Sequence, residues 1–308
     1  MHLSNYLDDV VVWAPAKVNL FLEVLGKRLD GYHEIATLMV AVRLYDTLVF
    51  HAELSPALCL HCSDSRLATG PENLVVRSAR LLQDRTGCKR GATIRLAKRI
   101  PMGAGLGGGS TDAAATLLGL NRLWQLGLSG GDLARLGGEI GSDVPFFFDT
   151  PAAWCTGRGE IVTSVKSPMP LNFVLLCPDF AMSTAEVYKK VVVPLAPITG
   201  EAIRRELQKG DVDSIGQLLH NRLQLAAETL EPRVAEYARL LAEAKPAGFL
   251  MSGSGSTLYA LCRSADEAGS IAASLKARFK ARGEPADLKG KPAREREDGV
   301  KLIVTRTV

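Results

Sequence analysis

Apolar side chains alternate with other residues along much of the N-terminal half of the chain. They occupy every second position from residue 18 to residue 24, which is the period of a strand. The segment Ala14-Pro15-Ala16-Lys17 precedes this stretch and predicts a break that directs Lys17 into a cleft. Shorter apolar or alternating runs predict further strands over residues 10–13, 35–44, 46–52 and 92–96. The polar, glycine-flanked residues 26–33 predict a loop.

Helical patterns follow these strands. Asn73 precedes residues whose apolar positions have helical spacing, so we expect it to cap a helix. A stretch rich in alanine and leucine predicts a helix over residues 111–125, and Ser129 with Asp132 resembles a capping box. In the second half we expect helices over 183–190, 203–208, 214–229, 233–244 and 265–280, and strands over 172–177, 248–251, 257–261 and 300–305. The charged segment 282–298 contains two prolines, so we expect a mobile surface excursion.

The order of these elements predicts the fold class. Strands come in runs instead of alternating strictly with helices, which favours an α+β fold over a doubly wound sheet. Prolines cluster between residues 150 and 171, the expected position of a domain boundary. We therefore predict two domains, residues 1–165 and 166–308, which suits a chain of 308 residues.

Composition and charge narrow the classes of function. Lys and Arg number 37 against 33 Asp and Glu, a net charge of +4, and the basic residues are scattered, so we expect no nucleic-acid partner. No apolar run approaches the ~20 residues that span a membrane, and residues 1–9 lack the apolar stretch of a secretory signal. The six scattered cysteines suit reduced thiols in the cytoplasm. Cys59 and Cys62 lack a second cysteine pair, so we expect no structural zinc site.

The densest chemical signal is a glycine-rich loop between a predicted strand and a predicted helix. Its candidate phosphate-binding residues are Pro101, Gly103, Ala104, Gly105, Leu106, Gly107, Gly108, Gly109, Ser110 and Thr111. Without side chains, backbone N–H groups can close around a phosphate, and the start of the helix adds a positive dipole end. Ser110 is also a candidate Mg²⁺ ligand. A flexible turn without a ligand is the alternative interpretation.

Other phosphate loops fit this segment poorly. A dinucleotide-binding fold would place an acidic residue ~20 positions downstream, and none stands there. The Walker pattern needs a lysine after the glycines, and protein kinases carry His-Arg-Asp and Asp-Phe-Gly motifs. The chain has neither.

The loop resembles the second motif of the GHMP small-molecule kinases. Two further segments are similar to the first and third motifs of that family, Ala14-Pro15-Ala16-Lys17-Val18-Asn19-Leu20 and Met251-Ser252-Gly253-Ser254-Gly255-Ser256-Thr257. The resemblance implies ATP and Mg²⁺, a ribosomal-protein-like N-terminal domain and a ferredoxin-like C-terminal domain.

Within that family the resemblance is to the branch that acts on 4-diphosphocytidyl-2-C-methyl-D-erythritol in the non-mevalonate pathway of isoprenoid precursors. It is carried by residues 17–22, 26–34, 141–147 and 157–160. Residues 282–298 have no counterpart, and Ser256 stands where proline or alanine is common. The resemblance implies that the 2-hydroxyl of this substrate is phosphorylated.

Several site residues follow from this resemblance. Asp143, in a loop between Gly141 and Pro145, is the candidate base for the acceptor hydroxyl, and we expect Lys17 beside it. The resemblance implies that Tyr32 and Tyr188 sandwich the cytosine ring, with His33 hydrogen-bonded to the base. Further candidates are Asn19 and Thr184 for the methylerythritol hydroxyls, Asn73 and Lys98 for the adenine pocket, and Gly253 and Ser254 for the substrate diphosphate. A helix cap and a solvated lysine are equally good interpretations of Asn73 and Lys98.

Three other functions stay open. The chain could be another GHMP kinase, such as homoserine or mevalonate kinase, against which Gly31-Tyr32-His33-Glu34 argues. It could be a catalytically dead ligand-binding relative, against which the presence of both Lys17 and Asp143 argues. A nucleic-acid-binding module is disfavoured by the scattered charge. We expect a small-molecule substrate, no membrane partner, and a monomer or homodimer.

Overall fold

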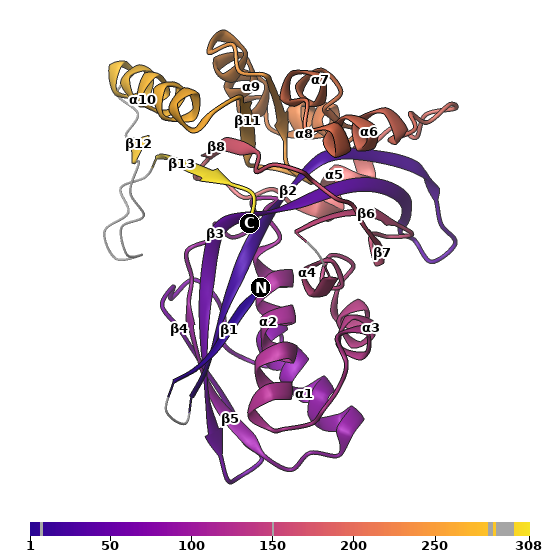
Figure 1. Ribbon diagram of the computed structural model, residues 1–308, viewed down its shortest axis with the longest axis vertical. Coiled ribbons are helices and arrows are strands. Elements are labelled where there is room, and N and C mark those ends of the chain that lie inside the picture. Colours follow the sequence, from indigo (N-terminus) through magenta and orange to yellow (C-terminus); the bar gives the residue numbers. More distant parts are fainter. Residues whose placement is uncertain (7–8, 150, 283–285, 288–298) are drawn as a thin grey trace. The chain divides into compact units, whose positions relative to one another are not determined.

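Two long strands, β2 (Asp9–Lys27) and β3 (His33–Glu53), contribute to both compact units of the computed structural model (Figure 1). The structure describes residues 1–6, 9–149, 151–282, 286–287 and 299–308. The first unit comprises residues 1–16, 44–100 and 107–150, and the second comprises 17–43, 101–106 and 151–308. The chain thus passes from one unit to the other several times. The contiguous domains expected from the sequence, 1–165 and 166–308, stay a prediction.

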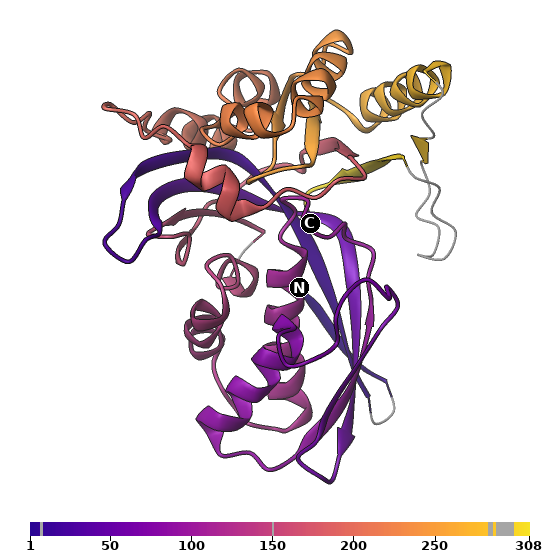
Figure 2. The ribbon, with the colours of Figure 1, turned by 180° about the vertical axis from the view of Figure 1, so that it is seen from behind.

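The first unit is a sheet covered by helices. Besides parts of β2 and β3 it contains β1 (His2–Tyr6), β4 (Leu58–Cys62), β5 (Gly91–Ala97), α1 (Leu74–Thr86), α2 (Gly108–Leu123), α3 (Gly130–Ile140) and α4 (Phe146–Asp149). The strand order is β1-β2-β3-β5-β4, in which β4 and β5 run parallel and the pairs β1–β2 and β3–β5 antiparallel. In Figures 1 and 2, α1, α2 and α3 lie on the same side of these strands. Buried apolar side chains from both layers form one core.

The second unit contains a further sheet and the remaining helices of the described chain. Its elements beyond β2 and β3 are β6 (Ala152–Thr156), β7 (Ile161–Ser164), β8 (Asn172–Cys177), α5 (Thr184–Lys190), α6 (Glu201–Lys209), α7 (Val212–Gln217), β9 (His220–Asn221), α8 (Gln224–Leu230), α9 (Arg233–Glu243), β10 (Gly248–Met251), β11 (Leu258–Cys262), α10 (Ala265–Ala281), β12 (Ala286–Asp287) and β13 (Val300–Arg306). The order β10-β11-β8-β13-β12 forms one sheet, while β6 pairs with β3 and β9 with β2. These mixed sheets and helices confirm the predicted α+β class.

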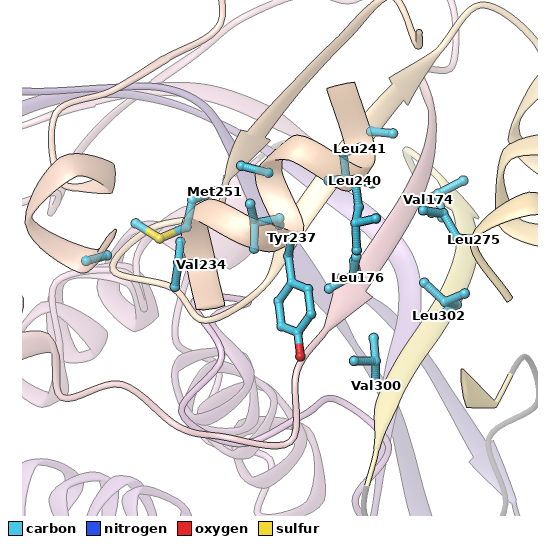
Figure 3. Packing of buried hydrophobic residues seen from close by; sticks show 14 of the residues in the cluster. Val174, Leu176, Val234, Tyr237, Leu240, Leu241, Met251, Leu275, Val300 and Leu302 are labelled. Carbon is cyan, nitrogen blue, oxygen red and sulfur yellow. The ribbon is translucent and has the colours of Figure 1, made fainter. Parts of the chain in front are cut away.

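The core of the second unit lies between the β8 sheet and helices α9 and α10. Figure 3 shows Leu176 of β8 among Leu240, Leu275 and Leu302, which come from α9, α10 and β13. Leu176 is fully buried and pairs in register with Leu302. Every second residue of β8 can therefore face this core, as a sheet covered on that face requires. Among the described residues, no helix combines the length and apolar character needed to cross a bilayer.

The predicted break at residues 14–17 is wrong, because β2 runs through it without interruption. The pairing of β1 with β2 ends at Trp13, so the strand edge beyond that residue needs no N–H from Pro15 for β1. Two residues later, on the same edge, the N–H of Lys17 donates to Leu106 O at 3.0 Å. Pro15 is thus tolerated because its missing donor lies on a stretch of the edge where no strand in the described part of the chain pairs. The strands predicted over 35–44 and 46–52 are likewise a single strand, β3.

The helix predicted over residues 214–229 is also wrong. The structure has two short helices, α7 and α8, separated by β9, which pairs in parallel with Phe21 and Leu22 of β2. The Asn221 side chain accepts from Leu223 N and donates to Met251 O and Gly253 O. Tertiary hydrogen bonds that no local pattern reveals therefore replace the middle of the helix.

Local capping signals were more reliable. Asn73 caps α1, with its side chain accepting from Val75 N, and Ser129 with Asp132 forms the expected capping box of α3. Helix α2 begins at Gly108, three residues earlier than predicted. Strand β13 confirms the closing strand predicted over 300–305. The surface excursion expected over 282–298 falls largely on residues 283–285 and 288–298, outside the described part of the chain.

Candidate active site

The two ends of the glycine-rich loop are held by Asp46, at the middle of β3. One oxygen of its carboxylate, Oδ1, accepts from the N–H groups of Arg99 and Ile100, just before the loop. The other, Oδ2, accepts from Lys98 Nζ at 2.5 Å, and Lys98 also donates to Asp112 Oδ2 of α2 at 2.6 Å. Asp46, Lys98 and Asp112 form what we call the loop-stem cluster. It connects the chain before the loop with the chain after it.

The loop-stem cluster is buried, with side-chain exposures of 4% for Lys98, 0% for Asp46 and 4% for Asp112. Burial raises the pKa of the Asp112 carboxyl to about 8 and outweighs the opposing charge of Lys98. The interpretation of Lys98 as a solvated lysine is therefore wrong. Sequence reasoning missed Asp46 and Asp112. The available signal was a single carboxylate in each of two mostly apolar segments, residues 44–50 and 112–118.

The start of α2 leaves polar groups facing inward. Gly107 precedes the helix with a φ of +71° and accepts from Thr111 N at 2.9 Å. The hydroxyl of Thr111 is buried without a hydrogen-bond partner in the described residues, whereas Ser110 is half-buried. A buried hydroxyl without a partner is uncommon in native structures and is a place to expect a ligand or water. Gly109 is exposed at the same turn.

In the middle of the loop, Gly105 comes very close to the predicted third motif. A Cβ on Gly105 would lie 2.0 Å from Ser252 O, and the residue has a φ of +73°. The Ser252 hydroxyl donates to Gly105 O at 2.9 Å, and Thr257 N donates to the neighbouring Ala104 O at 3.2 Å. Glycine is required here both for its backbone conformation and for the space. The structure thus brings the second and third motifs together in the second unit.

Other predicted residues of this loop make backbone contacts. Gly103, with a φ of +60°, accepts from Met182 N at 3.3 Å, and Leu106 accepts from Lys17 N. Pro101 is half-buried beside them in the chain. The carbonyl groups of Gly103 and Leu106 therefore accept hydrogen bonds from other segments of the second unit.

Lys17 begins a chain of buried hydrogen bonds. Its Nζ donates to Asn19 Oδ1 at 2.7 Å, and Asn19 Nδ2 donates to Thr37 Oγ1 at 2.8 Å. Thr37 in turn donates to Phe21 O at 2.6 Å. Because the Asn19 amide nitrogen donates to Thr37, the amide has a defined orientation and presents its oxygen to the ammonium. Lys17 is 3% exposed. Alternation of side chains along β2 directs it inward, so no break in the strand is needed.

The third motif is held by Asn221, which sequence reasoning missed. Its amide donates to Gly253 O at 2.7 Å. A Cβ on Gly253 would lie 3.3 Å from both Gly105 O and Lys17 Nζ, so this residue sits against both other motifs. Ser254 hydrogen-bonds through its hydroxyl with that of Thr184, at 2.8 Å. Four predicted substrate residues, Asn19, Thr184, Gly253 and Ser254, therefore belong to one connected group with Lys17 and Gly105.

The predicted cytosine-binding residues form a second group. The rings of His33 and Tyr188 lie 5.1 Å apart between centroids, with a tilt of 32°. Tyr32 is 54% exposed, and the Arg158 guanidinium lies 4.9 Å from its ring centroid. Partial burial, with a smaller contribution from Lys27, lowers the pKa of the His33 imidazole. In this structure Tyr188 is thus partnered by His33, while Tyr32 is partnered by Arg158.

Asp143 and Asn73 both belong to the first unit. Asp143 is half-buried in the turn that follows α3, where Val144 N donates to Gly141 O at 3.1 Å. Asn73 uses both ends of its amide locally, accepting from Val75 N and donating to Ala68 O. The helix-cap interpretation of Asn73 is therefore confirmed.

Family models cover both halves of the chain. The model for the GHMP kinases N terminal domain matches residues 73–155, and that for the GHMP kinases C terminal domain matches residues 203–281. A kinase of Pelotomaculum thermopropionicum, named 4-diphosphocytidyl-2-C-methyl-D-erythritol kinase, is 42% identical over 266 residues, which cover 86% of this chain and 93% of the relative. The chain belongs to the 4-diphosphocytidyl-2-C-methyl-D-erythritol kinases of the GHMP kinase family.

Further relatives of this kinase family agree. The protein of that name from Syntrophotalea carbinolica is 40% identical over 265 residues, covering 86% of this chain and 94% of the relative. A crystal structure of 4-(cytidine 5'-diphospho)-2C-methyl-D-erythritol kinase matches with a TM-score of 0.75 and 32% identity, covering 97% and 99% of the two chains. Homoserine kinase from Cytophaga hutchinsonii has the same TM-score at 20% identity, which shows a shared fold alone. ATP is the co-substrate of this kinase family.

Cys59 and Cys62 are the remaining pair that the sequence singled out. The Cys59 thiol lies 3.4 Å from His61 Nε2 on the exposed side of β4, while Cys62 is half-buried. Across the described ranges, no group of three or more His, Cys, Asp or Glu side chains could hold a metal ion. The expectation that this pair is no zinc site stays a prediction.

The close approach at Gly105 can be tested with a matched pair of alanine variants. Gly127 has nearly the same φ, +71°, but a Cβ there would meet nothing within 4 Å. We expect Gly105→Ala to displace the loop by about 1 Å and weaken ATP binding ten- to hundred-fold. Gly127→Ala should lose stability only through backbone strain, about 1 kcal/mol. Calorimetric titration and urea unfolding separate the two effects, and equal ATP affinities would contradict the role given to Gly105.

Proposed function

We propose that this protein transfers the γ-phosphoryl group of ATP to the 2-hydroxyl of 4-diphosphocytidyl-2-C-methyl-D-erythritol. The observation that carries the proposal is the 40–42% identity, over most of both chains, to relatives that bear the name of this kinase. The site supports it, since bare loop backbone, a buried ammonium and an aromatic group suit phosphate, a reacting hydroxyl and a pyrimidine ring. The protein would thus serve the non-mevalonate pathway of isoprenoid precursors.

The reaction needs positioning and charge neutralisation more than covalent catalysis. We assign Asp143 the role of base, which accepts the proton of the 2-hydroxyl group. The hydroxyl oxygen then forms its bond to the γ-phosphorus of ATP, and ADP leaves. Lys17, oriented by Asn19 and Thr37, would stabilise the charge that develops on the acceptor oxygen. These roles require both side chains to act on the same hydroxyl.

Recognition of the cytosine base is assigned to the aromatic group. Stacking on Tyr32 and Tyr188 tolerates any base, so hydrogen bonds must supply its identity. His33 is the candidate, and its lowered pKa keeps the imidazole neutral at pH 7, with one nitrogen donating and the other accepting. We assign the diphosphate to backbone N–H groups at Gly253 and Ser254, and the methylerythritol hydroxyls to Asn19 and Thr184.

On the ATP side, we assign the phosphates to the loop from Pro101 to Thr111 and the adenine pocket to the surroundings of Asn73. A magnesium ion usually keeps several waters and binds phosphate oxygens, so it needs few protein ligands. The site fits such an ion, because the half-buried Ser110 stands beside the unpartnered Thr111 hydroxyl. Ser110 is the residue that we propose to hold it. Bound Mg²⁺ would neutralise the charge of the phosphate groups.

We further propose a cytoplasmic protein that acts as a monomer or homodimer on small molecules alone. The six cysteines are free thiols in the structure, three of them buried, as suits a reducing compartment. Phosphorylation of homoserine or mevalonate stays the alternative activity. A ligand-binding relative without activity is the alternative of another class.

Purified protein with ATP, Mg²⁺ and single acceptors tests the proposed function. We expect ADP to form with 4-diphosphocytidyl-2-C-methyl-D-erythritol and to stay at background with homoserine or mevalonate. Phosphorus NMR of the product should show a new phosphomonoester and an intact diphosphate. Turnover with one of the other acceptors alone would replace the proposal, and ATP binding without turnover of any acceptor would favour the inactive relative.

The role of Asp143 as base predicts a large effect on turnover. Asp143→Asn keeps the size of the side chain but removes the proton acceptor, so kcat should fall ~10²–10⁴-fold while ATP binding persists. Lys17→Ala should be comparably damaging, and the double variant little worse, because the two groups act as a unit. A kcat above about a tenth of the wild-type value in Asp143→Asn would exclude the base role.

The cytosine pocket predicts an effect on one substrate only. Tyr32→Ala removes ~1–3 kcal/mol of base stacking, so KM for the cytidyl substrate should rise one to two decades. KM for ATP should barely change. Tyr6→Ala is the control, because Tyr6 is another exposed tyrosine, on β1. Equal weakening of both substrates would show that Tyr32 supports the fold instead.

A further inference from the structure

The loop-stem cluster occupies a position that the proposed chemistry does not use directly. Asp46 accepts two backbone N–H groups at the end of the segment that enters the glycine loop, at 2.5 Å from Arg99 and 2.9 Å from Ile100. Through Lys98 it is joined to Asp112, the fifth residue of the helix that leaves the loop. A single ammonium thus connects both stems of the loop.

The first residue of α2 is packed directly against this ammonium. A Cβ on Gly108 would lie 2.9 Å from Lys98 Nζ and 3.1 Å from Ile100 Cγ2. The backbone of Lys98 is fixed as well, since its N–H donates to Ser63 Oγ at 2.9 Å. Any shift of Lys98 would therefore be transmitted to the first turn of α2, where we place the phosphate-binding donors.

We propose that the side chains of Lys98 and Asp112 are positioning groups, which hold the backbone donors of the glycine loop in the geometry that the ATP phosphates need and do not themselves touch the nucleotide. This inference rests on the proposed function, because it presupposes that the loop binds ATP. The Lys98 ammonium is buried and lies within hydrogen-bond distance of two carboxylates. An ammonium that is hydrogen-bonded to both of these groups can affect ATP binding by holding together the chain segments before and after the loop.

The rival explanation is that Lys98 contacts adenine, as the sequence comparison suggested. The two explanations differ in which part of the nucleotide senses the cluster. A contact to adenine would affect adenosine and ATP alike. A cluster that positions the loop would affect the affinity for ATP and leave the affinity for adenosine nearly unchanged, because adenosine carries no phosphate.

The test uses Asp112→Ala and Asp112→Asn in the full-length protein. Alanine cuts the link to α2 but leaves Lys98 paired with Asp46, so a buried charge is not left without a partner. Asparagine keeps the shape and an oxygen that can accept from Lys98. We expect Asp112→Ala to weaken ATP binding about ten- to hundred-fold, as for a misplaced binding group. The affinity for adenosine should change less than about two-fold, because adenosine has no phosphate to be misplaced. Asp112→Asn should restore most of the ATP affinity.

A second pair of variants keeps the test decisive if Asp112→Ala does not fold. Gly108→Ala pushes directly on Lys98 and should weaken ATP more than adenosine. Gly130→Ala is its control, because Gly130 is the first residue of α3 and a Cβ there meets nothing within 4 Å. Neither glycine has a positive φ, so neither substitution strains the backbone.

Calorimetric titration with ATP and with adenosine gives distinct outcomes. Selective loss of ATP affinity in Asp112→Ala or Gly108→Ala, with recovery in Asp112→Asn, supports the inference. Parallel loss of both ligands, or no loss in either variant, overturns it. A wild-type protein that binds ATP no more tightly than adenosine would contradict the proposed function itself, which keeps the two failures distinguishable.

Discussion

A bare backbone can bind phosphate only if something else holds it in place, and this constraint governs the glycine loop. Glycines at 103, 105 and 107 have positive φ values that L side chains rarely adopt. They remove Cβ atoms, but they also remove the packing that would normally fix a chain segment. The structure restores order from outside the loop, through Ser252 against Gly105 and through Asp46 before the loop begins.

The same logic explains why charged and polar side chains are buried beside the predicted motifs. An unpaired buried charge is strongly destabilising, so the ammonium of Lys98 donates to the carboxyl groups of Asp46 and Asp112, and that of Lys17 donates to a directed amide. Such buried polar groups fix the positions of the side chains that they join, but they stabilise the fold less than apolar side chains in the same place would. A phosphoryl-transfer site benefits from that exchange, because its rate depends on fixed positions of donors and charges.

Local signals in the sequence predicted local structure well. The caps at Asn73 and Ser129, the alternation in β2 and the glycine loop depend on residues close together in the chain, and each was recognisable there. The failures at Pro15 and Asn221 have a common cause. Pro15 is tolerated because the pairing of β1 ends before it, and the middle of the predicted helix is replaced by hydrogen bonds of Asn221 to the third motif. Neither tertiary arrangement is visible in the local pattern.

The site divides in the same way. Motif residues such as Lys17 and Gly105 could be found because their types and spacing resemble those of a family. Asp46, Asp112 and Asn221 were missed, because each is an isolated polar residue whose partners are set by the tertiary fold and not by a motif. Sequence comparison thus identifies the residues that we assign to substrate binding. It identifies less readily the residues that position them.

The central claim is that backbone N–H groups of the glycine loop bind the phosphates of ATP. Hydrogen exchange of the peptide covering residues 101–112, followed by mass spectrometry, tests it most directly. Saturation with a non-hydrolysable ATP analogue should slow exchange in this peptide, while saturation with adenosine should leave it nearly unchanged. Unchanged exchange in this peptide when the analogue saturates the protein would contradict the account.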